Sequence, residues 1–165
     1  MTDAHLTDPP SAFIEEWAAM SAREHKGGRA LDVAMGRGRH AVVLARQGYR
    51  VFGVDIRCDV VRDAVRRAAR QGFVVLGWCA DLTTIALPVR RFDLIVVTRY
   101  LQRDFCQALT NALLPGGTLL FETFTEAQRD RGRGPTSPNH LLKSGELPTL
   151  FPELDALFYE ERIGL

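Results

Sequence analysis

A regular alternation of short apolar runs and helical segments, from residue 29 to residue 124, constrains the fold of this chain more than any other feature. Five runs are predicted to be strands: RALDVA, YRVFGVD, GFVVLGWCAD, RFDLIVVTRY and TLLFETF. The fourth is apolar on both faces, as a buried parallel strand must be. This rhythm predicts right-handed βαβ units, and so an α/β fold with a Rossmann-like, doubly wound, mostly parallel sheet and helices on both faces.

The helical segments between these runs have recognisable ends. RHAVVLARQG is expected to turn its valines inward and to end at Gly48. DVVRDAVRRAARQG is expected to begin near Asp59 and to end at Gly72. Its arginines have no aromatic residues among them, so they are more typical of a solvated face than of a nucleic-acid patch.

Composition restricts the class of protein. A chain of 165 residues is about one domain, and a formal net charge of +1 gives no overall field that would attract nucleic acid or a membrane. No apolar run approaches the roughly 20 residues of a membrane helix. The opening residues do not have the pattern of a signal peptide. We therefore expect a single cytoplasmic domain, residues 1–165, with no membrane partner and no nucleic acid as its main partner.

The three cysteines, Cys58, Cys79 and Cys106, are widely spaced and form no CxxC pair. Such a set favours neither a disulfide framework nor a zinc site. It is typical of small core residues in a protein from a reducing cytoplasm. We expect neither disulfides nor a metal here.

The stretch LDVAMGRGRH, residues 31–40, has the glycine spacing of a nucleotide-binding loop. In a dinucleotide-binding fold such glycines let the backbone approach a pyrophosphate. Asp32 would lie beside that dianion, and two like charges about 4 Å apart cost on the order of a few kcal/mol. S-adenosylmethionine carries an ammonium and a sulfonium but no phosphate, so Asp32 favours this ligand over a dinucleotide.

Two further acids, Asp55 and Asp81, end the second and third predicted strands. Asp55 can accept hydrogen bonds from both ribose hydroxyls, a role that NAD-binding folds also use. Asp81 can accept from the exocyclic amine of an adenine. Each acid has an alternative role as a helix cap. Three acids at the ends of three successive strands nevertheless favour an adenosine ligand with a cationic end.

These motifs resemble those of a known family. The stretches ALDVAMGRGRHAVVLARQGYRVFGVD, CADL, FDLIVVTRYL and LLPGGTLLFETF resemble the successive motifs of class I S-adenosylmethionine-dependent methyltransferases, over residues 29–124. The glycine turn, TRYL and PTSPNHLLKSGELPTLF are most similar to the tellurite-resistance-type (TehB-like) branch of small bacterial methyltransferases. The resemblance implies the Rossmann-like fold described above and S-adenosyl-L-methionine as cofactor, with S-adenosyl-L-homocysteine as product.

The resemblance also implies a place in the cofactor site for ten residues. They are Asp32, Ala34, Gly36 and Gly38 around the methionine portion, Asp55 and Ile56 at the ribose and adenine, Asp81 and Leu82 at the adenine edge, and Thr98 and Arg99 near the sulfonium. Ala34 stands where the family usually has its first glycine. Its methyl group narrows the space for the ligand, and we expect a negative φ to accommodate it.

The methyl acceptor is less clearly indicated. Methyl transfer needs mainly an acceptor lone pair held about 3 Å from the methyl, so the sequence need not contain a dedicated base. TRYL lacks the Asn-Pro-Pro-aromatic run of methyltransferases that act on exocyclic amines. We expect a small-molecule acceptor, with a thiol or another soft nucleophile favoured. The residues expected to face it are Tyr100, Arg103, Glu122, Thr123 and His140.

Two segments flank the predicted core, residues 29–124. Residues 1–28 are expected to form a helical cap, in which Phe13, Trp17 and Met20 either pack on the core or cover the ligand. Residues 125–165 are expected to form a substrate loop and one strand, ALFYEERIGL. The family usually has two strands there, one of them antiparallel. A single strand would leave an open edge, so we predict a homodimer joined at that edge.

Two other functions remain open at this point. A degenerate methyltransferase fold, kept as a binding or regulatory subunit, is consistent with Ala34 and with the short C-terminal part. A nicotinamide-linked oxidoreductase is consistent with the glycine turn, but Asp32 disfavours it.

Overall fold

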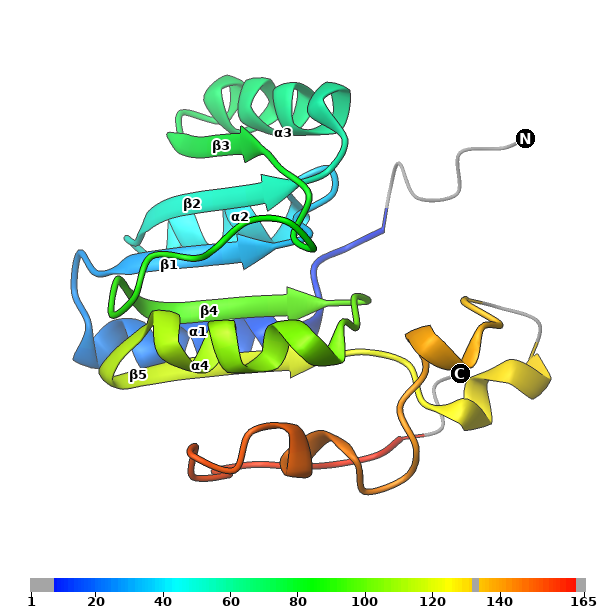
Figure 1. The fold of residues 1–165 in the computed structure, drawn as a ribbon. Coiled ribbons are helices and arrows are strands. Elements are labelled where there is room, and N and C mark those ends of the chain that lie inside the picture. Colours follow the sequence, from blue (N-terminus) through cyan, green and yellow to red (C-terminus); the bar gives the residue numbers. More distant parts are fainter. Residues whose placement is uncertain (1–7, 132–133, 163–165) are drawn as a thin grey trace.

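The computed structural model describes residues 8–131 and 134–162, and its centre is a parallel sheet of five strands (Figure 1). The strands are β1 (Arg29–Val33), β2 (Arg50–Asp55), β3 (Val75–Cys79), β4 (Phe92–Thr98) and β5 (Leu113–Glu122), in the order β3-β2-β1-β4-β5. The predicted α/β fold with a parallel sheet is confirmed. The chain reverses its direction of winding between β1 and β4, and a doubly wound sheet binds ligands in the crevice at such a point.

Helices cover both faces of the sheet. The helices are α1 (Ala12–Glu24), α2 (Arg39–Arg46), α3 (Cys58–Arg70) and α4 (Cys106–Ala112). The first three pack on one face with Leu94 and Val96, whereas α4 packs on the other with Ile95 and Val97. Alternate residues of β4 therefore enter two separate cores, which explains why this strand is apolar at each position from Leu94 to Val97.

The fifth strand begins earlier than predicted. The sequence placed its start at Thr118, after a break at PGG, but β5 already pairs with β4 at Leu113. A shift in register between Phe92 and Leu94 absorbs the extra residues, and Gly116 has a φ of 77° there. The glycines are thus a bulge within the strand, not its boundary.

The first helix packs on the core as predicted for Phe13 and Trp17, but not for Met20. Ile14, Ala18 and Ser21 point into the core, while Met20 is about half exposed. Phe13 and Trp17 lie at the rim of this core. Helix α1 therefore packs on the sheet, as one of the two alternatives for residues 1–28 expected.

The prediction of a C-terminal strand is wrong for the described residues. From residue 151 to residue 162 the chain forms neither helix nor strand. Phe151 contacts Phe121 of β5 on the α4 face, with ring centroids 5.6 Å apart. Phe158 contacts Phe13 and Trp17 of α1 on the opposite face, at 5.8 and 5.7 Å. We call residues 151–158 the C-terminal strap, because it passes from one face of the sheet to the other.

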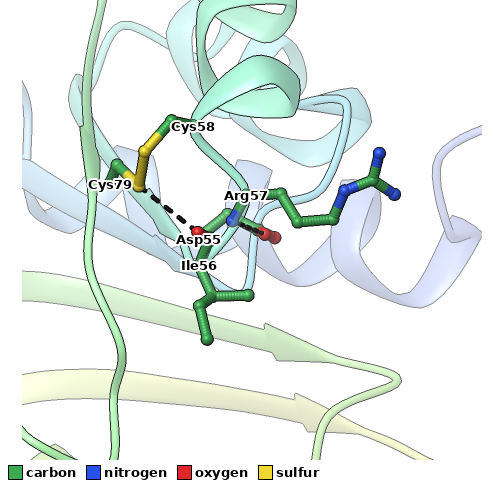
Figure 2. Close-up of a disulfide and its surroundings, with 5 residues drawn as sticks. All are labelled: Asp55, Ile56, Arg57, Cys58 and Cys79. Carbon is green, nitrogen blue, oxygen red and sulfur yellow. Dashed lines mark hydrogen bonds between the residues drawn. A yellow bond between two sulfur atoms is a disulfide. The ribbon is translucent and has the colours of Figure 1, made fainter.

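The cysteine prediction also needs correction. Cys58, the first residue of α3, and Cys79, the last residue of β3, form a disulfide with their Cα atoms 5.0 Å apart (Figure 2). Parallel pairing places Asp55 opposite Cys79, and this brings together two cysteines that are 21 residues apart in the sequence. Cys106 is a buried free thiol, as expected, and burial raises its pKa to about 11.

Candidate active site

The turn after β1 uses left-handed backbone at three places. Ala34, Gly36 and Gly38 have φ values of 52°, 51° and 75°. The expectation of a negative φ at Ala34 is therefore wrong, and its side chain occupies a conformation that costs an L-residue roughly 1–2 kcal/mol. The turn tightens in this way because Gly38 N–H donates to the Met35 carbonyl at 2.9 Å.

The two glycines of this turn serve different purposes. A Cβ atom on Gly36 would meet nothing within 4 Å, so the space above Gly36 is open to a ligand. A Cβ atom on Gly38 would lie 2.9 Å from the Cβ of Ala64 in α3. Gly38 is therefore required for the packing of α3, and Gly36 faces the crevice.

Asp55, at the end of β2, holds the glycine turn in place. Its Oδ2 accepts a hydrogen bond from Gly36 N–H at 2.9 Å, and its Oδ1 accepts from Arg57 N–H at 3.0 Å. One carboxylate thus links the turn after β1 with the connection between β2 and α3. The ribose role expected of Asp55 would add to these two bonds.

Ile56, which follows β2 directly, is a large apolar residue with 62% of its surface accessible. Figure 2 shows its side chain pointing away from the neighbouring disulfide. The Sγ atom of Cys79 lies 3.3 Å from the Ile56 carbonyl oxygen. The disulfide therefore fixes the backbone that presents Ile56, and an exposed apolar side chain here suits the flat face of an aromatic ring.

Asp81 follows β3 and is engaged locally. Its Oδ1 accepts hydrogen bonds from the Thr83 hydroxyl at 2.7 Å and from Thr83 N–H at 2.9 Å, and these bonds lower the pKa of the Asp81 carboxyl. Leu82 is buried in the core beside it. Burial, and then the charge of Asp81, raise the pKa of Tyr100, so Tyr100 lies on the same side of the crevice. Its hydroxyl donates to the Gln102 side chain.

Asp32 is fully buried rather than exposed beside the turn. It precedes the last residue of β1, between Gly53 of β2 and Val96 of β4. Neither carboxylate oxygen has a hydrogen-bond partner, although the nearby Ala41 N–H and Arg39 favour the charged form. Burial outweighs both and raises the pKa of Asp32 to about 7.

Two arginines meet at the ends of α2 and β4. Arg39 begins α2 and Arg99 follows β4, and the Oδ2 atom of Asp8 contacts the Nη1 atoms of both, at 3.5 and 2.5 Å. Burial, and then the charge of Arg99, lower the pKa of Arg39, while Asp8 and Glu122 oppose this effect. The site therefore holds a pair of guanidinium groups close to Asp8 and Glu122.

Thr98 and His40 lie under this arginine pair. Both are buried, and His40 Nδ1 is 3.3 Å from the Thr98 hydroxyl oxygen. The other ring nitrogen, Nε2, accepts a hydrogen bond from Ser11 N–H at 3.1 Å. Thr98 thus connects, through His40, to the segment that precedes α1.

Of the five residues expected to face the acceptor, Arg103 is the most fully engaged. Its guanidinium donates to both carboxylate oxygens of Glu146, at 2.6 and 2.9 Å, and to the Leu141 and Asn139 carbonyls at 2.9 and 3.2 Å. Arg103 therefore ties the loop that contains His140 to the end of β4. His140 itself is exposed, in the short turn Pro138–His140.

The other two lie at the end of β5. Glu122 is the last residue of this strand, its carbonyl accepts a hydrogen bond from Arg99 N–H at 2.8 Å, and Thr123 follows it. Two groups of predicted residues therefore form: one around the glycine turn and the end of β2, and one around the ends of β4 and β5.

Sequence reasoning missed Asp8, Arg39 and His40. Arg39 and His40 follow the glycine turn directly in GRGRH, and their charge and ring nitrogens could have marked them. Asp8 carries no such signal, because its contact with Arg99 joins residues 91 positions apart. No group of three or more His, Cys, Asp or Glu side chains within residues 8–131 and 134–162 is placed to hold a metal ion.

Comparison with known proteins agrees with this architecture. A curated relative, the ubiquinone biosynthesis O-methyltransferase of Coxiella burnetii, is 30% identical over 132 residues, which cover 74% of this chain and 53% of that protein. The chain thus spans about half the length of the curated relatives that it matches.

Solved structures show the same fold. A SAM-dependent methyltransferase from Aquifex aeolicus has a TM-score of 0.69 at 19% identity, covering 90% of this chain and 84% of its own. An S-adenosylmethionine-dependent methyltransferase from Mesorhizobium loti has a TM-score of 0.54 at 28% identity, covering 67% of this chain and 53% of its own.

The family assignment rests on a third comparison. The family described as "Methyltransferase domain" matches residues 30–117, from the first residues of β1 into β5. This match covers more than half of the chain and includes the glycine turn, Asp55 and the end of β4. The chain therefore belongs to the methyltransferase domain family.

Proposed function

We propose that this chain transfers a methyl group from S-adenosyl-L-methionine to a small-molecule acceptor that reacts as an anion, with a thiol or another soft nucleophile as the first candidate. The observation that carries this proposal is the meeting of two guanidinium groups, those of Arg39 and Arg99, at the carboxyl edge of the sheet, where β1 and β2 also present Gly36 and Asp55. The cofactor and the acceptor would then approach one edge of the sheet from two sides.

The residues present fit the cofactor. The open space above Gly36 admits a ligand close to the backbone. The exposed side chain of Ile56 offers an apolar surface to adenine, and Asp55 and Asp81 offer carboxylate oxygens to hydroxyl and amine donors. Asp55 and Asp81 place negative charge at this edge of the sheet, which suits a cationic guest better than a pyrophosphate.

The chain's own contribution to the chemistry would be alignment and charge. When bound, the cofactor supplies a methyl group already activated by positive sulfur. The two guanidinium groups, opposed in part by Asp8 and Glu122, would lower the pKa of an acidic acceptor beside them and so favour a thiolate near neutral pH without a dedicated base. A thiol, with an ordinary pKa of about 8.5, gains more from this effect than a phenol at about 10.

A phenolic oxygen is the second candidate acceptor. The relative from Coxiella burnetii is named as an O-methyltransferase, and the match covers most of this chain. The arginine pair would serve a phenolate in the same way, at a higher pH. We also propose that the chain belongs to the tellurite-resistance-type branch, which TRYL and PTSPNHLLKSGELPTLF support. This makes a metalloid oxyanion a third candidate acceptor.

The experiment combines binding with a panel of acceptors. Calorimetry measures the affinity for S-adenosylmethionine, and labelled cofactor reports methylation of a small thiol, a catechol and tellurite. Asp55→Ala is expected to abolish binding, partly because it also releases Gly36. Asp55→Asn keeps one acceptor oxygen and separates the two effects. Binding of NADH instead of S-adenosylmethionine would reject the proposal.

The same experiment tests the alternative of a binding or regulatory subunit. That role, which Ala34 and its strained φ support, requires cofactor binding without turnover on any acceptor. Arg99→Lys is a suitable companion variant, because it keeps the charge and removes the fork-shaped donor. Loss of turnover with unchanged cofactor affinity would support a role for Arg99 on the acceptor side.

A homodimer through the C-terminal side of the sheet remains part of the proposal. The strap of residues 151–158 already lies at β5, so pairing with a second copy would have to displace it or build on it. Light scattering decides between a monomer and a dimer. Nucleic acid stays outside the proposal, since the arginines of α3 have no aromatic residues among them on which bases could stack.

We also propose a cytoplasmic location. The Cys58–Cys79 disulfide removes the argument drawn from unpaired cysteines, because exposed disulfides are uncommon in a reducing cytoplasm. None of the helices in the described residues is long and apolar enough to cross a membrane. Thiol trapping in intact cells would show the redox state of this pair and so the kind of compartment.

A further inference from the structure

His40 is a buried titratable residue that the chemistry described above does not use. It is the second residue of α2, and its ring joins two segments that are distant in the sequence. Ser11, just before α1, donates its N–H to Nε2, and Thr98, the last residue of β4, lies against Nδ1. Both ring nitrogens are therefore in contact with specific partners.

These partners determine which nitrogen carries the proton. A backbone N–H can only donate, so Nε2 must accept from Ser11 and carries no proton. A neutral imidazole then has its proton on Nδ1, which donates to the Thr98 hydroxyl oxygen. Burial, and then Arg39 and Arg99, lower the pKa of His40 to about 4, so the ring stays neutral at neutral pH.

The direction of this bond has a consequence for Thr98. Its hydroxyl oxygen accepts from His40, so its own proton remains to be donated to another group. Thr98 ends β4, next to Arg99, where the proposed acceptor would lie. A hydroxyl that donates there would hold one lone pair of the acceptor atom and leave another directed at the methyl group.

We propose that His40 is a positioning residue, which fixes the Thr98 hydroxyl as a hydrogen-bond donor to the methyl acceptor. This inference rests on the proposed function and deepens it, because it assigns a contact to the acceptor atom itself. A purely structural His40 would need only its bond to Ser11. A positioning His40 needs the bond to Thr98 as well.

Two substitutions at position 40 separate the two bonds. His40→Asn keeps an N–H donor at about the distance of Nδ1 but cannot reach Ser11. His40→Gln places an acceptor oxygen near Nε2 but has no donor close to Thr98. Thr98→Val removes the hydroxyl and Thr98→Ser restores it, with His40 intact. Thr110→Val, on α4, is the matched control, because the Thr110 hydroxyl donates only to the Cys106 carbonyl within its own helix.

With a small thiol as acceptor, His40→Gln and Thr98→Val are expected to lower kcat about 5- to 10-fold, the loss of one ordinary hydrogen bond in the transition state. His40→Asn and Thr98→Ser should recover most of this loss. The affinity for S-adenosylmethionine should change less than about 2-fold in the two His40 variants, and Thr110→Val should behave as the wild type.

Nitrogen-15 spectra of labelled histidine test the bond without any turnover. The proton is expected on Nδ1 of His40 in the wild type, and its resonance should move in Thr98→Val and return in Thr98→Ser. A proton on Nε2 would overturn the inference. So would equal losses in His40→Asn and His40→Gln that follow melting temperature. If no acceptor is methylated, the proposed function fails, but the spectra still decide whether His40 donates to Thr98.

Discussion

At the scale of the residue, Asp32 differs most from its prediction. The sequence predicted a carboxylate between the first strand and the glycine turn, and Asp32 is the last residue but one of β1. Its state could not be predicted, because the burial of Asp32 depends on α2 packing over the strand. A local pattern gives the position of an acid, whereas its pKa depends on everything packed around it.

The raised pKa of Asp32 makes stability depend on pH. The unfolded chain loses the Asp32 proton near the ordinary value of 3.8, and the folded protein keeps it to about pH 7. The folded state thus binds more protons in this window, so stability should fall as pH rises through it, by up to about 4 kcal/mol.

Asp32→Asn should remove this decline, and urea unfolding of both proteins at several pH values between about 4 and 8 measures it. Parallel curves for the two proteins would contradict the assignment to Asp32.

Ala34 offers a second test at this scale. Its φ of 52° destabilises the folded state by roughly 1–2 kcal/mol, a strain that glycine does not have. Glycine also has more conformational entropy in the unfolded chain, and this offsets part of the gain. Ala34→Gly should therefore raise the free energy of unfolding by about 0.5–1 kcal/mol. Ala41→Gly, inside α2, is the control and should lower it by about 1 kcal/mol. Thermal melts compare the two, and a loss at both positions would show that Ala34 is not strained.

At the scale of the element, the connection between β2 and α3 carries the clearest constraint. Asp55, just before this connection, accepts a hydrogen bond from the glycine turn. Cys58, just after it, is joined to β3 by the disulfide with Cys79. The sequence indicated both strands and the helix, because apolar period and glycine ends are local signals. The disulfide escaped prediction, since it depends on which strands become neighbours and in what register.

Reduction of this disulfide should destabilise the protein. The bridge closes a loop of about 20 residues, for which chain entropy predicts about 3 kcal/mol. Cys58→Ser with Cys79→Ser should lower the midpoint of urea unfolding by a corresponding amount, and a reducing agent should do the same to the wild type. The reducing agent should leave the double variant unchanged. An equal effect on the double variant would place the sensitivity elsewhere.

At the scale of the whole molecule, the sequence predicted the sheet and the helices on its two faces, but not the long-range contacts between α1, β5 and the C-terminal strap. Five strands and the helices between them follow from periodicity within each segment. The face of helix α1 was predicted only in part: Phe13 and Trp17 pack on the core, but Met20 is half exposed. The contact of these two rings with Phe158 joins distant parts of the chain, so no local pattern could indicate it. The predicted strand, ALFYEERIGL, overlaps the strap at residues 156–158. Instead of a strand, the strap is an irregular segment in which Phe151 and Phe158 contact opposite faces of the sheet.

The strap gives a stability prediction for the whole domain. Phe158 is 49% exposed and contacts two aromatic rings of α1. Phe158→Ala should lower the free energy of unfolding by about 1–2 kcal/mol, since each aromatic pair contributes roughly 0.5–1.5 kcal/mol. Leu157→Ala, at a side chain 76% exposed, is the control and should stay within about 0.5 kcal/mol of the wild type. Similar losses in both variants would show that the rings of α1 are not what anchors the strap.

The contact between Phe158 and α1 also sets an order of events during synthesis. A chain that leaves the ribosome from its N-terminus exposes Phe13 and Trp17 long before Phe158 is translated. Until the strap has emerged, the rings of Phe13 and Trp17 in α1 therefore lack their contact with Phe158. Nascent chains stalled before residue 158 should bind chaperones that recognise exposed aromatic side chains, and the 165-residue chain released from the ribosome should not.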